Sequence, residues 1–124
     1  MFKYTFSSGL FSLPGNAASV DWAVLNNSPA AEMIRVTVYQ GGIGVAKTSV
    51  APGAITATLQ PSFVTHNANG VGTNGPFKHG FYYEVVVETN DRRVLPMVNV
   101  WSDNGGTLIP GTLIAAADFL LLEP

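Results

Sequence analysis

The two histidines of the chain are the residues whose chemistry best suits metal binding or proton transfer. His66 and His79 stand at opposite ends of one stretch, THNANGVGTNGPFKHG (65–80). A zinc site needs three or four protein ligands, and Glu84 is the carboxylate nearest to either histidine in the stretch that follows. Closure of a loop would bring two ligands together and leave the others missing. We therefore expect no metal and no cofactor, and histidines that are solvated or hydrogen-bonded locally.

The same stretch is a candidate ligand loop. Asn69-Gly70 and Asn74-Gly75 favour sharp turns, and neither a strand period nor a helix period runs through it. Long loops in compact domains are usually functional or mobile. Asn, Thr and His side chains on a loop suit sugar hydroxyls, so the candidate ligand residues are His66, Asn67, Asn69 and His79. In a self-assembling protein, such a loop can equally reach a neighbouring subunit.

The sequence contains no recognisable catalytic motif. No nucleophile or general base occurs in a pattern with a second residue that would orient it. No serine lies in a G-x-S-x-G elbow. Glu84 and Glu88 share one face of an expected strand, but strand rise separates them by roughly 13 Å, which is more than glycosidases use. The glycine-rich GGIG (41–44) lies between expected strands and lacks the helix that a phosphate site requires. We predict that the chain is not an enzyme.

Alternation with a period of two dominates the rest of the chain, which is typical of half-buried strands. In one segment, Ile34, Val36 and Val38 share a face, while Arg35 and Tyr39 lie on the other. The segments that we expect to be strands are SVDWAVLN (19–26), IRVTVYQ (34–40), AITATL (54–59), FYYEVVVETN (81–90), RVLPMVNVWS (93–102) and DFLLLE (118–123). Among the aromatic residues, Tyr39 is the one that we expect to be exposed.

Turn residues such as Pro52-Gly53 and Pro110-Gly111 separate these segments at intervals of about 10 to 15 residues. We predict an all-β fold of about eight strands, in which two antiparallel sheets pack face to face as a β-sandwich of jelly-roll or immunoglobulin-like topology. The pattern leaves the strand order open. Pro96 cannot donate to a sheet ladder, so its strand is expected at a sheet edge or at a bulge.

Composition favours self-association over most other classes of partner. Charged residues make up 11% of the 124 residues, and hydrophobic residues 47%, whereas soluble domains average about 25% charged residues. Such a surface is expected when the exterior packs against copies of itself, although a neutral monomer is the alternative. The net charge of −2 argues against nucleic acid or anionic lipid as a partner. No apolar run is long enough for a membrane span, and there is no cysteine.

The N-terminal segment has a pattern of its own. Phe2, Tyr4 and Phe6 alternate with polar residues, Leu10 and Phe11 follow, and Pro14-Gly15 then precedes the rest of the domain. We divide the chain into an N-terminal strand or arm with its linker (1–18) and a β-sandwich domain (19–124). Residues 2–7 are either the first strand of the same sheet or a detachable strand that completes the sheet of a neighbouring subunit.

Four segments read together, VDWAVLNNSP, IRVTVYQ, GFYYEVVVETN and IPGTLI, give the chain a family resemblance. It resembles small single-domain β proteins of unknown function from spore-forming bacteria and, more loosely, the jelly-roll subunits of spore-appendage and other extracellular fibres. The resemblance covers about residues 19–114. Those fibre subunits carry a short N-terminal connector that typically supplies cysteines. This chain has a similar layout in 1–18 but no cysteine, so strand complementation and packing alone would join its subunits.

Two functions are carried forward from the sequence. The first is a structural, self-assembling subunit of a filament or other homopolymer, joined by the arm residues Phe2, Tyr4, Phe6, Leu10 and Phe11. The second is a carbohydrate-binding, lectin-like module that uses the 65–80 loop and Tyr39, with glycans as its partners. The N-terminus lacks the apolar stretch of a classical signal peptide. The residues do not determine the cellular compartment. The resemblance to fibre subunits implies an extracellular, cell-surface or spore-surface location.

Overall fold

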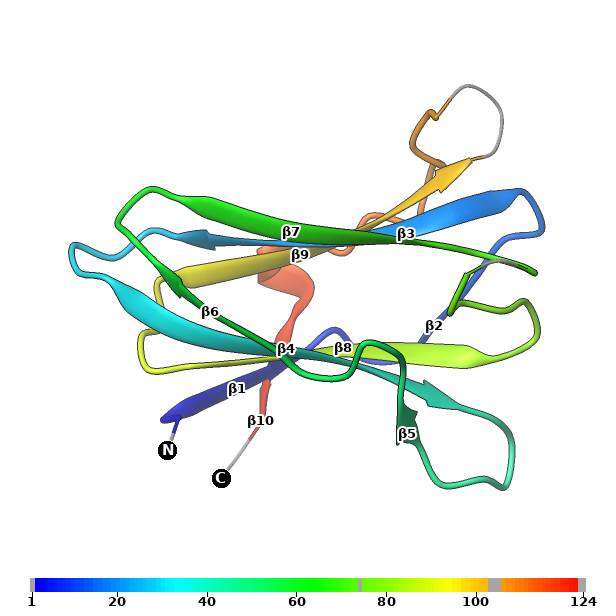
Figure 1. The fold of residues 1–124 in the computed structure, drawn as a ribbon, viewed down its shortest axis with the longest axis horizontal. Helices are drawn as coiled ribbons and strands as arrows, with labels where there is room; N and C mark the ends of the chain where they lie inside the picture. Colours follow the sequence, from blue (N-terminus) through cyan, green and yellow to red (C-terminus); the bar gives the residue numbers. More distant parts are fainter. Residues whose placement is uncertain (1, 74, 103–105, 123–124) are drawn as a thin grey trace.

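The computed structural model describes residues 2–73, 75–102 and 106–122. Within them the chain forms two stacked layers of β-strands (Figure 1). The strands are β1 (Tyr4–Ser7), β2 (Phe11–Ser12), β3 (Ala17–Asn26), β4 (Glu32–Gly41), β5 (Thr48–Ser49), β6 (Ile55–Leu59), β7 (Val64–Gly70), β8 (Tyr82–Thr89), β9 (Val94–Ser102) and β10 (Leu120–Leu122), and a 3-10 helix, η1, spans Ala116–Asp118.

One layer is a seven-stranded sheet and the other is a three-stranded sheet. The larger sheet has the order β10-β1-β8-β4-β5, with β2 also paired to β8 and β6 also paired to β4. The smaller sheet has the order β7-β3-β9. All of the strand pairs are antiparallel. The predicted all-β sandwich of two antiparallel sheets is therefore confirmed.

The core lies between the two sheets and follows the alternation in the sequence. Each long strand turns every second residue toward the other layer, and those side chains are buried. The smaller sheet contributes Val20, Trp22, Val24, Val98 and Val100, and the larger sheet contributes Ile34, Val36, Val38, Tyr83, Val85 and Val87. The side-chain faces predicted for β3, β4 and β8 are confirmed.

Both ends of the chain join the larger sheet. β1 lies between β8 and β10, and β2 continues along the same edge of β8. After β9, residues 107–114 run back along that strand, with Ile114 bridged to Val98. The chain then crosses through η1 to the other layer, where Phe119 is buried beside the core and β10 begins (Figure 1). β9 is an edge strand of its sheet, as Pro96 predicted.

The structure corrects the expectation that 65–80 is one long loop. Its first part is β7, which pairs with β3 from Val64 to Gly70. Among the described residues that follow β7, Phe77 is buried, and its ring meets the Tyr83 ring edge-on at 4.8 Å. Polar residues on both faces of β7 masked its strand character, and its pairing with β3 outweighs their low β-propensity.

Asn26 ties together three parts of the fold. Its side chain is fully buried, and its Nδ2 donates to the carbonyls of Ala30 at 2.8 Å and Leu59 at 2.9 Å. Its Oδ1 accepts a hydrogen bond from the backbone N–H of Ser28 at 2.9 Å. One amide thus links the end of β3, the turn into β4 and the end of β6, and so connects the two sheets.

We predict that Asn26→Ala lowers the free energy of unfolding by about 3 kcal/mol, because it leaves buried backbone groups without partners. The measurement is urea denaturation monitored by tryptophan fluorescence. Asn27→Ala is the matched control, since Asn27 is exposed and its side chain makes no hydrogen bond in the described part of the chain. Equal effects of the two substitutions would contradict the role given to Asn26.

Candidate functional site

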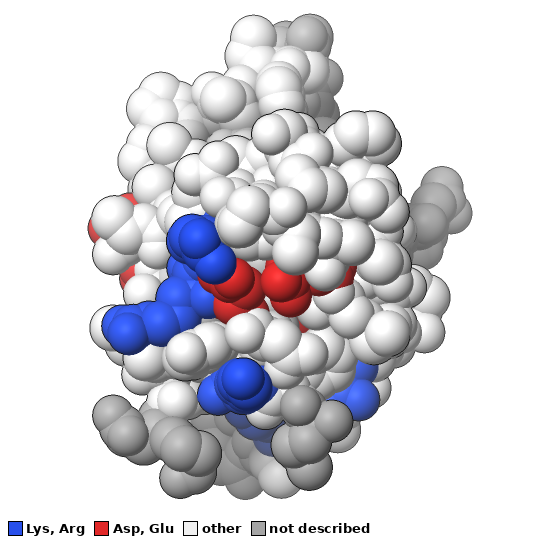
Figure 2. Space-filling model, turned by 90° about the vertical axis from the view of Figure 1, so that its left-hand side faces the viewer, with Lys and Arg blue, Asp and Glu red and all other residues white. Residues whose placement is uncertain are grey.

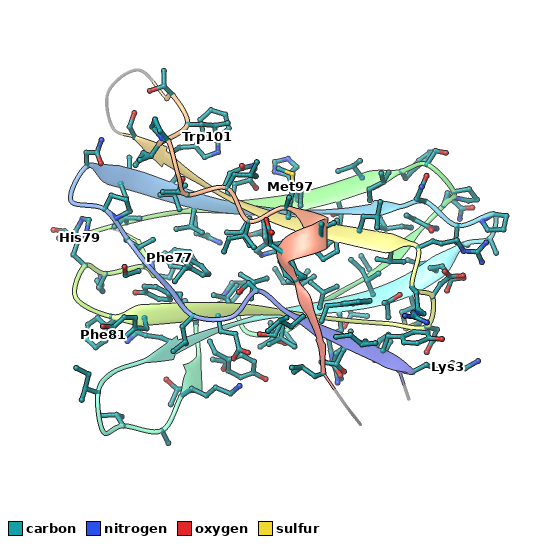
Figure 3. The ribbon with its side chains drawn as sticks, turned by 180° about the vertical axis from the view of Figure 1, so that it is seen from behind. Lys3, Phe77, His79, Phe81, Met97 and Trp101 are labelled. Carbon is teal, nitrogen blue, oxygen red and sulfur yellow. The ribbon has the colours of Figure 1, made fainter. Side chains whose placement is uncertain are left out.

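The structure does not bring the four predicted ligand residues together. On β7, the side chain of His66 lies on the outer face of the sheet, whereas Asn67 and Asn69 are half-buried on the opposite face and hydrogen-bond to each other. His79 lies before β8 at the end of the sandwich opposite Lys3 (Figure 3). It is exposed and has no hydrogen bond or ion pair with a described residue.

His66 has one polar partner, on the neighbouring strand. Its Nδ1 lies 3.3 Å from Oδ1 of Asp21 on β3. Across the described ranges, no group of three or more His, Cys, Asp or Glu residues is placed to hold a metal ion. Tyr39, the other residue of the lectin hypothesis, lies on the larger sheet. The Lys47 ammonium covers its ring, 4.5 Å from the centroid. The carbohydrate-binding hypothesis stays a prediction, with its residues on two different sheets.

The arm residues of the sequence analysis pair within their own chain in this structure. Phe6 and Phe11 pack against the core, which is the role expected of the first strand of a sheet. Phe2 and Tyr4 meet guanidinium groups instead: Arg35 lies over the Phe2 ring at 5.3 Å and Arg92 over the Tyr4 ring at 5.8 Å. Leu10 stands apart, because it is 73% exposed at the bend between β1 and β2.

The outer face of the larger sheet is stabilised by ion pairs. Arg35 on β4 and Glu88 on β8 lie side by side in register and form a two-pronged pair, with both N···O distances 2.8 Å. Lys47 reaches Glu84 on the same face at 2.7 Å, and Ser7 donates to the same carboxylate at 2.6 Å. These charged side chains cover the sheet, and we call them the ionic face.

Glu84 shows what this environment does to a carboxylate. Burial alone raises the pKa of Glu84, but the hydrogen bonds from Lys47 and Ser7 and the charge of Lys47 outweigh it. The net result is a pKa below the ordinary value of 4.5. The carboxylate is therefore held in its ionised form by the partners that pack around it, and its place in the sheet is structural.

A further charged cluster lies at the turn between β8 and β9. Asp91 accepts hydrogen bonds from the backbone and the guanidinium of Arg93, which lower the pKa of Asp91 to about 2. Figure 2 views this end of the molecule. Its blue and red side chains form a band across the middle and lower part, toward the larger sheet, while most of the surface is white. At this end of the molecule, charge thus gathers toward the larger sheet.

The outer face of the smaller sheet is apolar, in contrast. Strand register places Val64, Leu25 and Leu95 in one row across all three strands. The next row consists of His66, Ala23 and Met97. Figure 3 shows Met97 and Trp101 on the side of β9 that points away from the larger sheet. We call this surface the apolar face; its apolar members are Ala23, Leu25, Val64, Leu95, Met97, Leu113, Ala115 and Ala116.

Two features make the apolar face a candidate interaction surface. The segment after β9 borders it, and Leu25, Leu95, Met97 and Leu113 help to line a hollow of about 250 Å³ there. No Lys or Arg belongs to β3, β7 or β9, and Asp21 is the one carboxylate on those strands. An extended apolar surface with so little charge is typical of a surface that another molecule covers.

Sequence reasoning missed the apolar face, although a signal for it was present. A sheet with one solvated face alternates cleanly between apolar and polar residues. β3 and β9 break that rule, because Ala23 and Leu25 face outward in β3 while Leu95 and Met97 do so in β9. Apolar residues on both faces of a strand are therefore the sequence signal that could have pointed to this surface.

Comparisons with known proteins identify the fold alone. No family model matches the chain, and no curated protein matches it. The chain is similar in structure to a protein from Thermotoga maritima, described as the crystal structure of Thermotoga maritima 1070. The two share 13% sequence identity and a TM-score of 0.57 over 90% of each chain. The resemblance to spore-appendage and fibre subunits stays a prediction.

In the described ranges, no helix has the length and apolar character to cross a bilayer.

We predict that Glu84→Gln lowers the free energy of unfolding by about 1 kcal/mol at pH 7, because the charged acceptor for Lys47 and Ser7 is lost. The pKa of Glu84 is lowered in the folded state. Its stabilisation is therefore complete above the unfolded-state pKa and disappears as the pH falls through the folded-state pKa. The difference between wild type and variant should shrink below about pH 5, as measured by urea denaturation across pH.

Glu32→Gln is the control for this prediction. It removes the same charge, but the side chain of Glu32 makes no hydrogen bond in the part of the chain that the structure describes. A difference for Glu84→Gln that stays constant down to the lowest pH would contradict the assignment.

Proposed function

We propose that this protein is a non-catalytic structural subunit that assembles with copies of itself, and that the apolar face is its principal contact. The observation that carries the proposal is the apolar face itself, which spans all three strands of the smaller sheet, none of which carries Lys or Arg. Val64 is 60% exposed and Leu113 is 57% exposed. Covering such side chains contributes about 25 cal/mol for each Å² of apolar surface removed from water.

A second copy is the partner that this surface fits. A strongly charged partner would lose the hydration of its charges against an apolar face and gain no counter-charges. A second copy of the same face carries few charges, so it has little of this cost. The small residues Ser19, Ala23, Ala68 and Gly70 lie on the outer faces of β3 and β7, where a second sheet can approach to the usual spacing of about 10 Å.

We predict that Val64→Lys weakens self-association by at least about 100-fold, because a charge without a partner would be buried in the contact. Val45→Lys is the matched control, since Val45 is 68% exposed between β4 and β5 of the other sheet. Sedimentation velocity over a range of protein concentrations measures both. A wild-type chain that stays monomeric throughout would contradict self-assembly, and loss of association in Val45→Lys alone would place the contact elsewhere.

Exchange of the N-terminal arm is the proposed means of extending the assembly beyond a pair. The arm lies along one edge of β8, and the contacts of Phe6 and Phe11 can form equally with β8 of a neighbour. Gly15 and Asn16 are exposed in the turn between the arm and β3, closed by a hydrogen bond from the Ala17 N–H to the Pro14 carbonyl. Opening that turn would release the arm, as in domain swapping.

Because the chain lacks cysteine, an engineered disulfide can report arm exchange. Thr5 and Glu88 are opposite each other in the β1–β8 ladder. The hydrogen bond from the Ser8 N–H to the Val85 carbonyl places them in a non-hydrogen-bonded pair, where Cα atoms are about 4.5 Å apart. That spacing suits a disulfide.

We predict that oxidised Thr5→Cys/Glu88→Cys protein gives a ladder of covalent oligomers on a non-reducing gel, and that reduction collapses the ladder to one band. Exchange links each arm to a neighbour, whereas pairing within one chain gives covalent monomers only. The single variants Thr5→Cys and Glu88→Cys are the controls for random cross-linking, which stops at dimers. A monomer band alone in the oxidised double variant would show that the arm does not exchange.

A further inference from the structure

We propose that two copies meet through the apolar face about a two-fold axis, with Asp21 of each facing His66 of the other, and that protonation of His66 strengthens this contact. The inference rests on the proposed function and adds to it a specific alignment and a response to pH. It arises from Asp21 and His66, the acid–base pair on the outer face of the smaller sheet.

The pair occupies the middle of the outer face of the smaller sheet. The row of Val64, Leu25 and Leu95 lies on one side of it, and the row of Gly70, Ser19 and Trp101 lies on the other. The imidazole of His66 is 67% exposed, and the Asp21 carboxylate beside it is 17% exposed. A molecule that covers the apolar face must therefore cover this acid and this base as well.

Charge complementarity points to a second copy as the covering molecule. A two-fold contact repeats itself. If residue i of the first copy touches residue j of the second, then residue j of the first copy also touches residue i of the second. An acid and a base side by side on one face meet this requirement, because rotation places each acid opposite the other copy's base. A face with a single type of charge would repel itself. The Asp21–His66 pair thus gives the alignment that the surrounding apolar residues do not specify.

The surroundings of His66 contain few other ionisable groups in the described part of the chain. β3 contributes Asp21, the facing positions of β9 are Met97, Asn99 and Trp101, and β7 has no further ionisable side chain. β6 has none either. The segment after β7 carries His79 and Lys78, and the Lys78 ammonium is held by the carbonyls of Gly72 and Gly75.

Assembly should therefore take up protons. Covering the face removes water from the Asp21 carboxylate, which is costly unless a charged partner is present. Protonated imidazole is such a partner, and it donates charge-assisted hydrogen bonds. Histidine is the side chain that ordinarily changes its charge between about pH 5 and 8. The assembled state binds the proton more tightly than the separate copies, so the association constant rises as the pH falls.

Sedimentation equilibrium from pH 8 to pH 6 tests the proposal on the full chain. The wild type should associate at least about tenfold more tightly at pH 6 than at pH 8. A chain with net negative charge also loses self-repulsion as the pH falls, so His79→Gln is the matched control. It removes the same titrating charge from a site outside the apolar face, and it should keep the pH dependence. His66→Gln should abolish it.

A charge exchange tests the alignment directly. Asp21→His combined with His66→Asp keeps one acid and one base on the face, and it should restore association and its pH dependence. Asp21→Asn alone should weaken association at pH 6 and flatten the profile. Undiminished pH dependence in His66→Gln would overturn this inference while leaving self-assembly intact. Absence of association by the wild type at every pH would overturn both.

Discussion

A sandwich of two sheets covers only one face of each sheet, and this constraint governs the surface of the whole molecule. Every strand has two faces because side chains alternate. Packing the layers together buries the inner set and leaves the outer set to be stabilised in another way. With charged residues at 11% of the chain, there are too few of them to solvate both outer faces. The two sheets meet this constraint differently.

The larger sheet uses its charges in pairs. Arg35 with Glu88 and Lys47 with Glu84 lie on the outer face, where their alkyl stems cover the sheet while the charges satisfy one another. Each exposed ion pair contributes little to the free energy of unfolding. The main effect of these pairs is to keep the outer face of the larger sheet hydrated, which disfavours packing against another sheet. The smaller sheet has no such cover, and its outer residues Leu25, Leu95 and Met97 remain available for contact.

The period-two alternation in the sequence predicts the buried faces of the strands well. The buried faces of β3, β4 and β8 follow from period two alone, and Pro96 marked an edge strand correctly. The sequence predicts a loop at β7 because Asn67, Asn69 and Gly70 are poor strand formers, and pairing with β3 makes this segment a strand. The contact between His66 and Asp21 joins residues far apart in the sequence, so strand register had to be known first.

The number of contacts per subunit decides what kind of assembly is open to this chain. A two-fold contact through the apolar face is satisfied once two copies meet, and it gives a closed pair. A filament needs a second contact that links pairs. The edges of the larger sheet offer little for that purpose as they stand. β10 is three residues long, and the opposite edge consists of β5, with two residues, and β6, with five. Short edge strands resist pairing with other sheets.

Exchange of the arm escapes this limit, because it uses β8, which lies inside the sheet and has eight residues. The exchanged strand replaces hydrogen bonds that already exist, so the enthalpy changes little, and the equilibrium is set by the turn at Pro14–Asn16 and by protein concentration. With both proposed contacts, the chain would form discrete pairs under one condition and extended polymers under another. The balance between pairs and polymers is set by the strength of the apolar-face contact relative to that of the exchanged arm. The arm can link only copies that lie within its reach.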